Sequence, residues 1–94
     1  MDAGNPEIES VLIVDDDASV RRMLLEYLGN HGYAVDAVAD GAQMRESLAH
    51  HVPDLVLLDL NLPGMNGIAA VERIGREAPG VPVVIISAHP EPAQ

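Results

Sequence analysis

The sequence predicts an α/β fold in which a doubly wound parallel sheet carries helices on both faces. Short runs of Val, Ile and Leu without polar alternation occur around residues 13, 56 and 85, as is typical of strands buried on both faces. Segments with helical spacing of apolar residues separate the predicted strands, and strands that alternate with helices form parallel sheets with right-handed crossovers. The chain of 94 residues has the size of one domain.

The first strand is expected over residues 11–14, directly before three consecutive aspartates. A helix follows over residues 18–28 with Arg21 facing outward, and Gly29 and Gly32 end it. The apolar residues of this helix fall at helical spacing, so they are expected to face the core: Val20, Met23, Leu24 and Tyr27.

The second strand is expected over residues 33–38, and Asp40 with Gly41 opens a second helix, which Pro53 stops. The apolar side of this helix is weaker and is expected to comprise Ala42, Leu48 and Ala49, joined by Met44 and Val52.

The third strand is expected over residues 54–58 and the fourth over residues 83–86. Between them, residues 61–67 have the composition of a turn. A third helix then ends at Pro79 and Gly80, and its core side is expected to comprise Ile68, Val71 and Ile74. The last six residues, 89–94, include two prolines and are expected to form an irregular tail.

The charge and composition of the chain exclude several classes of function. Fifteen acidic residues against five arginines and no lysine give a net charge of −10, which makes binding to nucleic acid or to an anionic membrane surface unfavourable for this segment. There is no Cys, so a disulfide or thiol chemistry is excluded. Residues 1–10 are polar and acidic, unlike a secretion signal, so we expect a flexible leader and a cytoplasmic protein.

Acidic residues follow two of the predicted strands. Asp15 and Asp16 come after the first apolar run, and Asp59 comes after the third. Ligand sites of open parallel sheets lie at the carboxyl ends of the strands, so these acids converge if the two strands are neighbours. Converging carboxylates repel one another unless a cation joins them, and Mg²⁺ prefers such oxygen ligands. The alternative for any single Asp is a solvated helix cap, which fits Asp17 well.

Four separate motifs follow one another along the chain. They are VLIVDDD at residues 11–17 followed by an Arg-Arg-Met-Leu helix, PDLVLLD at 53–59, LPGMNG at 62–67 and VPVVIISA at 81–88. In this order the motifs resemble the receiver domain of two-component response regulators, over residues 11–88. The resemblance implies a flavodoxin-like fold with four strands in the order 2-1-3-4 and about three helices.

The resemblance also implies roles for individual residues. Asp59 matches the phosphoacceptor, which takes a phosphoryl group from a histidine kinase or phosphotransfer protein. Asp15 and Asp16 match the acid pair that holds Mg²⁺ together with Asp59 and the main-chain carbonyl of Asn61. Ser87 matches the switch hydroxyl that bonds the new phosphoryl group. Such a domain is a regulator that accepts phosphate and is not an enzyme with its own substrate.

The sequence departs from the receiver pattern in two ways. Receiver domains continue through a fifth βα unit, and their fifth strand ends in a Lys that contacts the phosphoryl group, whereas this sequence has no Lys. One preorganised contact of this kind is worth about 10²–10³ in rate, so impaired phosphorylation is expected. The fourth strand is then expected to be a poorly covered edge, which predicts a homodimer or larger oligomer.

Two other functions remain open from the sequence. One is a module of receiver descent that acts by oligomerisation or protein interaction without phosphorylation. The other is a phosphatase, because residues 15–17 also resemble the Asp-x-Asp motif of haloacid-dehalogenase-type enzymes, with Asp15 as nucleophile and Asp17 as acid/base. The chain leaves little room for that larger domain. Four histidines lack a common helical face with a carboxylate partner: His31, His50, His51 and His89. His50 and His51 fit the end of the second helix better than a pair of metal ligands.

Overall fold

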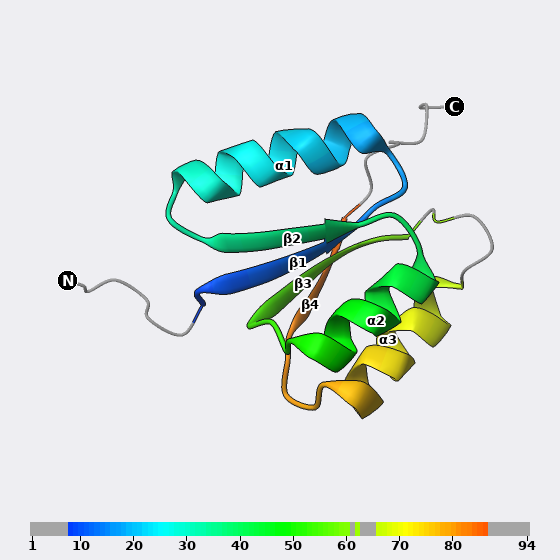
Figure 1. Cartoon of the computed structure of the whole chain (residues 1–94). Coiled ribbons are helices and arrows are strands. Elements are labelled where there is room, and N and C mark those ends of the chain that lie inside the picture. The colour runs from blue at the N-terminus through cyan, green and yellow to red at the C-terminus, as the bar shows by residue number, and fades with distance from the viewer. Residues whose placement is uncertain (1–7, 61, 63–65, 87–94) are drawn as a thin grey trace.

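The computed structural model describes residues 8–60, 62 and 66–86. Within this part, four parallel strands form one sheet in the order β2-β1-β3-β4, and three helices connect them (Figure 1). The fold class and strand order predicted from the sequence are therefore confirmed. In chain order the elements are β1 (Ser10–Val14), α1 (Ala18–Asn30), β2 (Ala34–Val38), α2 (Gly41–His50), β3 (Leu55–Asp59), α3 (Gly67–Glu77) and β4 (Val83–Ile86).

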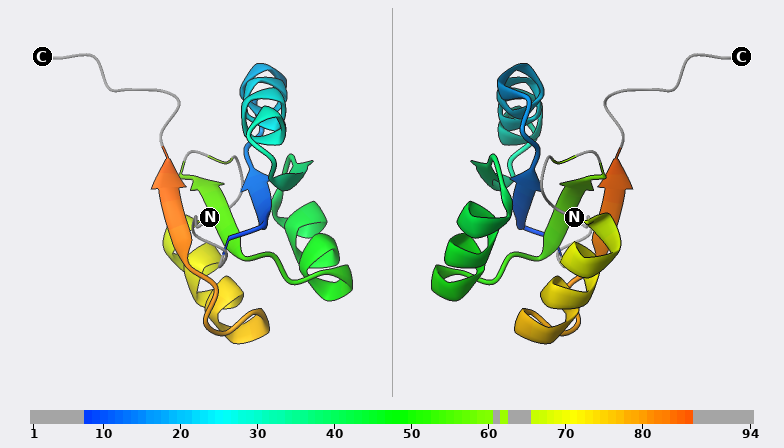
Figure 2. Two further views of the ribbon diagram at one scale, coloured as in Figure 1. Left: turned by 90° about the vertical axis from the view of Figure 1, so that its left-hand side faces the viewer. Right: turned by 90° about the vertical axis from the view of Figure 1, so that its right-hand side faces the viewer.

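The helices are divided unequally between the two faces of the sheet. Helix α1 alone lies on one side, next to β2 and β1, whereas α2 and α3 lie together on the other (Figures 1 and 2). The two helices cover a larger part of their face than α1 covers of its own. We therefore expect the better packed core on the side of α2 and α3.

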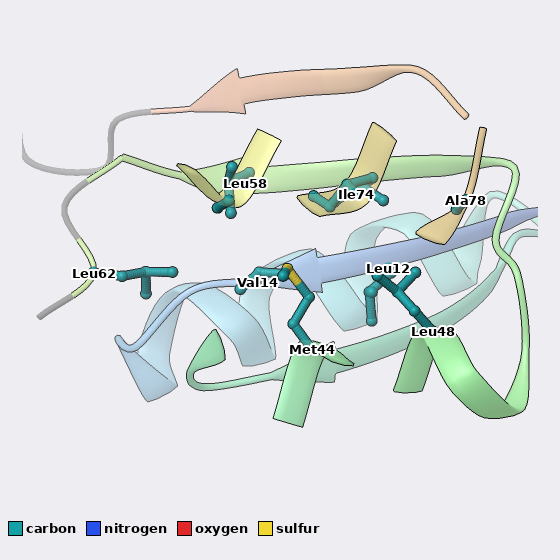
Figure 3. Packing of buried hydrophobic residues seen from close by; sticks show 10 residues of the cluster. Leu12, Val14, Met44, Leu48, Leu58, Leu62, Ile74 and Ala78 are labelled. Atoms are coloured by element: carbon teal, nitrogen blue, oxygen red, sulfur yellow. The ribbon is translucent and has the colours of Figure 1, made fainter. Parts of the chain in front are cut away.

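The main core lies between the sheet and the helices α2 and α3 (Figure 3). Alternate residues of the central strands point toward it, with Leu12 and Val14 of β1 beside Val56 and Leu58 of β3. The helices and the adjoining loops contribute Met44, Leu48, Leu62, Ala70, Ile74 and Ala78. Every one of these side chains is at most 5% exposed, so β1 and β3 are firmly buried on this face.

The core side of α3 differs from the sequence prediction. Ile74 is fully buried as expected, but Ile68 is 72% exposed and Val71 is 37% exposed. A spacing of three residues advances about 300° around a helix, so Ile68 lies about 120° away from Ile74. The buried stripe instead repeats every four residues through Ala70, Ile74 and Ala78. Its small alanines let α3 approach the sheet closely.

The predictions for α1 and α2 were wrong for several residues as well. No residue of α1 is buried, and Met23 and Tyr27 are 57% and 59% exposed, because no other described helix shares its face of the sheet. In α2, Met44 and Leu48 are buried, whereas Val52 is 53% exposed and two alanines are exposed: Ala42 and Ala49. The larger side chains occupy the space beside the sheet.

Polar contacts fix the start of β1. The Asp54 carboxylate accepts hydrogen bonds from the backbone N–H groups of Glu9 and Ser10, at 2.9 and 3.1 Å. These bonds hold the pKa of Asp54 below its usual value. They join the beginnings of β1 and β3, two segments far apart in the sequence, and so support the pairing on which the site depends.

The fourth strand forms an edge of the sheet within the described residues, as expected. Val84 and Ile85 are 46% and 41% exposed although both are large and apolar. Among the described helices, none has both the length and the apolar character needed to cross a bilayer. Residues 1–7 of the expected leader and the whole expected tail, 89–94, lie outside the described residues.

The packing of α3 can be tested with one pair of variants. Ile74→Ala is expected to lower the free energy of unfolding by about 2–5 kcal/mol, because it leaves a cavity in the core. Ile68→Ala removes an equally large side chain from the exposed side of the same helix and should change stability by no more than about 0.5 kcal/mol. Urea unfolding followed by circular dichroism measures both. Equal losses would contradict the described orientation of α3.

Candidate functional site

The register of the sheet brings two acids together at its carboxyl edge. Val14 of β1 pairs with Leu58 of β3, so the next residues, Asp15 and Asp59, lie side by side. The Asp15 N–H donates to the carbonyl oxygen of Val38 at 3.0 Å and extends the ladder between β1 and β2 by one residue. Both aspartates are buried, at 0% and 1% exposure. The convergence expected from the two apolar runs is therefore present.

Asp16 completes a cluster of three carboxylates. One oxygen from each of Asp15, Asp16 and Asp59 lies within 4.8 Å of the other two, and Asp16 is exposed to solvent. Ligands of an octahedral Mg²⁺ ion are at most about 4.2 Å apart, twice the Mg–O distance. The separation in the cluster needs at most a small side-chain movement to match. No other group of three such ligands occurs within residues 8–60, 62 and 66–86.

The two oxygens of Asp15 have different surroundings. Oδ1 accepts a hydrogen bond from the Asp17 N–H at 2.8 Å. Oδ2 is buried and accepts no hydrogen bond from the part of the chain that the structure describes. A buried polar atom in this state is costly, and a bound cation would satisfy it. The donor set, three carboxylates with one open oxygen, therefore fits a hard divalent cation.

Electrostatics at this edge oppose the charged form of Asp15. Burial raises the pKa of Asp15, and the neighbouring charges of Asp59, Asp16 and Asp17 raise it further, while the hydrogen bond from the Asp17 N–H partly offsets these effects. The cluster is thus unfavourable by itself. A divalent cation would remove the repulsion, so metal binding and folding stability are coupled here.

Asp17 has a separate, structural role. Its Oδ1 accepts hydrogen bonds from the N–H groups of Ser19 and Val20, at 2.8 and 3.4 Å, and caps α1. The predicted helix cap is therefore confirmed. A carboxylate used in this way does not join the cluster and does not favour the acid/base role that a phosphatase would need.

Arg21 contributes a contact that sequence reasoning missed. It was expected to face outward, but its Nη1 donates to the carbonyl oxygen of Asp15 at 2.8 Å. This bond holds the turn between β1 and α1, where two of the three clustered acids lie. The only signal in the sequence was an arginine in the first turns of the helix, and a long side chain that folds back on the preceding loop leaves no periodic pattern.

The remaining predicted residues are divided between the described and the undescribed parts of the chain. Asn61, Ser87 and His89 lie outside the described residues. Gly67 opens α3 close to the site, and a Cβ at this position would come 2.6 Å from Cδ2 of Leu60. His50 Nδ1 lies 2.8 Å from the Glu46 carbonyl oxygen at the end of α2, as expected. His31 Nδ1 lies 2.8 Å from the Tyr27 carbonyl oxygen at the end of α1.

Comparison with protein families identifies the chain. The family described as the response regulator receiver domain matches residues 11–94. The chain belongs to the receiver domain family. Receiver domains are regulatory phosphoacceptors of two-component systems that are phosphorylated by histidine kinases and bind Mg²⁺ at an acidic pocket. A cluster of aspartates is present in this chain.

Two curated relatives show how much of a regulator the receiver occupies. The DNA-binding transcriptional regulator NtrC of Escherichia coli (strain K12) is 39% identical over 79 residues, which cover 84% of this chain and 17% of NtrC. The DNA-binding response regulator MtrA of Mycobacterium tuberculosis (strain H37Rv) is 46% identical over 80 residues, which cover 85% of this chain and 35% of MtrA. The chain thus spans about a sixth and about a third of these relatives.

Solved structures agree with the receiver fold. The chemotaxis response regulator CheY4 of Vibrio cholerae superimposes with a TM-score of 0.80 at 28% identity, covering 90% of this chain and 72% of CheY4. The beryllofluoride-activated NtrC receiver domain gives a TM-score of 0.74 at 35% identity, covering 88% of this chain and 67% of that domain.

The coupling between charge repulsion and stability can be tested with Asp15→Asn. In metal-free buffer at pH 7 the variant is expected to raise the free energy of unfolding by about 1–3 kcal/mol, because an uncompensated charge leaves the buried edge. The pKa of Asp15 is raised in the folded chain, so the wild type gains stability as the pH falls through that raised pKa toward the unfolded value near about 3.9. The difference in free energy of unfolding between D15N and the wild type should therefore become smaller at low pH.

Urea unfolding with EDTA at several pH values measures this difference. The matched control is Asp16→Asn, since Asp16 is exposed and its charge is better solvated, so a smaller gain is expected. Addition of Mg²⁺ should stabilise the wild type more than D15N. A wild type that is more stable than D15N without metal at pH 7 would contradict the electrostatic argument.

Proposed function

We propose that Asp59 accepts a phosphoryl group while Asp15, Asp16 and Asp59 hold Mg²⁺. The observation that carries the proposal is the meeting of three carboxylates at the edge of the sheet, with one buried oxygen of Asp15 left without a hydrogen bond within the described chain. The chain belongs to the receiver domain family, whose members accept phosphate on an aspartate.

In the proposed reaction, a carboxylate oxygen of Asp59 attacks the phosphorus of a phosphohistidine on a kinase or phosphotransfer protein. The new O–P bond forms as the N–P bond breaks, and the histidine nitrogen leaves with its electron pair. β3 holds Asp59 in place, because the ladder to β4 continues beyond it through the Leu60 N–H and the Ile86 carbonyl oxygen at 3.3 Å. Bound Mg²⁺ supplies the positive charge that offsets the transferring phosphoryl group.

Two further groups belong to this proposal. The main-chain carbonyl of Asn61 would complete the metal ligands, and the Ser87 hydroxyl would bond the phosphoryl oxygen after transfer. Both assignments rest on the matching motifs. The 94 residues include no Lys. We therefore also propose that this chain by itself is phosphorylated about 10²–10³-fold more slowly than a receiver that has the lysine contact.

A phosphodonor experiment tests the phosphoacceptor role. Incubation with acetyl phosphate and Mg²⁺ is expected to add one phosphoryl group, seen by intact-protein mass spectrometry, and EDTA should prevent it. Asp59→Asn should abolish the adduct. Asp36→Asn changes an exposed aspartate on the edge strand β2 and should leave the adduct unchanged. An adduct that persists in D59N would exclude Asp59 as the acceptor.

A second candidate function is a receiver-derived module that acts by self-association without phosphorylation. The specific observation is the exposed apolar surface of β4, where Val84 and Ile85 lie on an edge strand whose neighbour on one side is β3. Edge strands with unblocked backbone groups and no charged side chain pair readily with other strands. A second copy of this chain could provide such a strand.

Self-association through β4 predicts a homodimer or larger oligomer that a single charge disrupts. Val84→Glu is expected to shift the chain to monomer, because a carboxylate would have to enter the apolar contact. Val71→Glu places the same charge on an exposed apolar position of α3 and should leave the oligomer intact. Sedimentation velocity over a range of concentrations distinguishes these outcomes. A wild type that remains monomeric throughout would reject the oligomer.

A further inference from the structure

Arg21 contacts the turn that carries two of the three clustered acids. This turn, residues 15–17, connects β1 to α1 (Figure 1). The Arg21 Nη1 donates a hydrogen bond to the carbonyl oxygen of Asp15 at 2.8 Å, in a partly buried position. The Arg21 backbone N–H donates to the carbonyl oxygen of Asp17 at 3.0 Å, so one residue holds both ends of the turn. Because the guanidinium is charged, its bond is about twice as strong as a bond between neutral groups.

The bond from Arg21 leaves Asp15 with a single uncommitted polar atom. The Asp15 N–H donates to the Val38 carbonyl oxygen at 3.0 Å. The Asp15 carbonyl oxygen accepts from Arg21, and Oδ1 accepts from the Asp17 N–H at 2.8 Å. The remaining atom, Oδ2, is buried and accepts no hydrogen bond from the described residues. The backbone and one carboxylate oxygen are thus held, so the direction of Oδ2 is set before a cation arrives.

Asp16 depends on the same bond for its position. Its side chain is exposed and makes no hydrogen bond with the described part of the chain. The peptide group that Arg21 holds is the one that joins Asp15 to Asp16, and the planar peptide keeps the Asp15 carbonyl and the Asp16 N–H in one plane. The bond from Arg21 therefore orients the backbone from which the Asp16 carboxylate reaches the cluster.

We propose that Arg21 is a positioning residue that makes the cluster selective for Mg²⁺ over Ca²⁺. This selectivity rests on the metal site proposed above. Mg²⁺ requires near-ideal octahedral geometry with oxygens at about 2.0–2.1 Å, whereas Ca²⁺ accepts irregular geometry at about 2.3–2.6 Å. A turn held at the Asp15–Asp16 peptide keeps two of the three carboxylates in the narrow arrangement that Mg²⁺ needs. Loss of the bond loosens this arrangement and weakens binding of the smaller ion more.

The ratio of the two affinities separates positioning from the other effects of Arg21. If Arg21 only stabilised the fold, its loss would weaken the binding of both ions alike. The charge of Arg21 does not produce a difference either, because Mg²⁺ and Ca²⁺ carry the same charge and are repelled to a similar extent. A change in the ratio therefore reports the geometry of the carboxylates.

The test titrates the full ¹⁵N-labelled chain with MgCl₂ and with CaCl₂ and follows the amide chemical shifts of residues 15–17. Arg21→Gln is expected to weaken Mg²⁺ binding about tenfold or more, as for other groups that orient metal ligands. Ca²⁺ binding should weaken by no more than about threefold, because this ion tolerates displaced ligands. The matched control is Arg22→Gln, which removes the same charge from an exposed neighbour without a hydrogen bond to the described residues. It should leave the ratio unchanged.

Arg21→Lys provides a second variant in case the glutamine disrupts the turn. Lysine keeps the charge and offers a donor on a long stem, so its ratio should lie between those of the wild type and R21Q. Circular dichroism and urea midpoints in EDTA show that each variant folds. An equal loss for both ions, or an unchanged ratio in folded R21Q, would overturn the role of Arg21 and leave the metal site in place. A wild type that binds neither ion would contradict the metal site itself, and the selectivity with it.

Discussion

The parallel register between β1 and β3 is the constraint on which the site depends. Because Val14 pairs with Leu58, the residues that follow are placed side by side, and both are aspartates. Burial and like charge then make this edge of the sheet unfavourable without a cation, as the raised pKa of Asp15 shows. Strand order and pairing therefore bring Asp15 and Asp59 together, and the turn after β1 adds Asp16. A slip of one residue in register would send one acid to the opposite face.

Local contacts divide the three consecutive acids into different roles. Asp17 is used to cap α1, and its N–H binds Oδ1 of Asp15, so the chain turns sharply out of β1. Arg21 holds the same turn through the Asp15 carbonyl oxygen. Asp16 is left exposed at the mouth of the cluster. The same residue type thus provides a buried ligand, an exposed ligand and a helix cap within three positions.

The strands and the convergence of the acids could be predicted from the sequence, whereas the buried sides of the helices were predicted correctly only for Met44, Leu48 and Ile74. An apolar run that ends in an acid indicates both a buried strand and the residue at its carboxyl edge, so one pattern gives the fold and the site together. Helix faces depend on which side meets the sheet. The triplet spacing from Ile68 to Ile74 was misleading because it rotates away from the stripe through Ala70 and Ile74. The contact of Arg21 depends on its side chain folding back onto the turn before α1, and the spacing of residues in the sequence does not indicate this.

The two central strands connect the acidic site to the core beside α2 and α3. The clustered acids lie directly after β1 and at the end of β3, and these two strands also supply four of the ten buried residues of the core beside α2 and α3. α1 has no buried residue, so most of the packing that holds the acids comes from the opposite face.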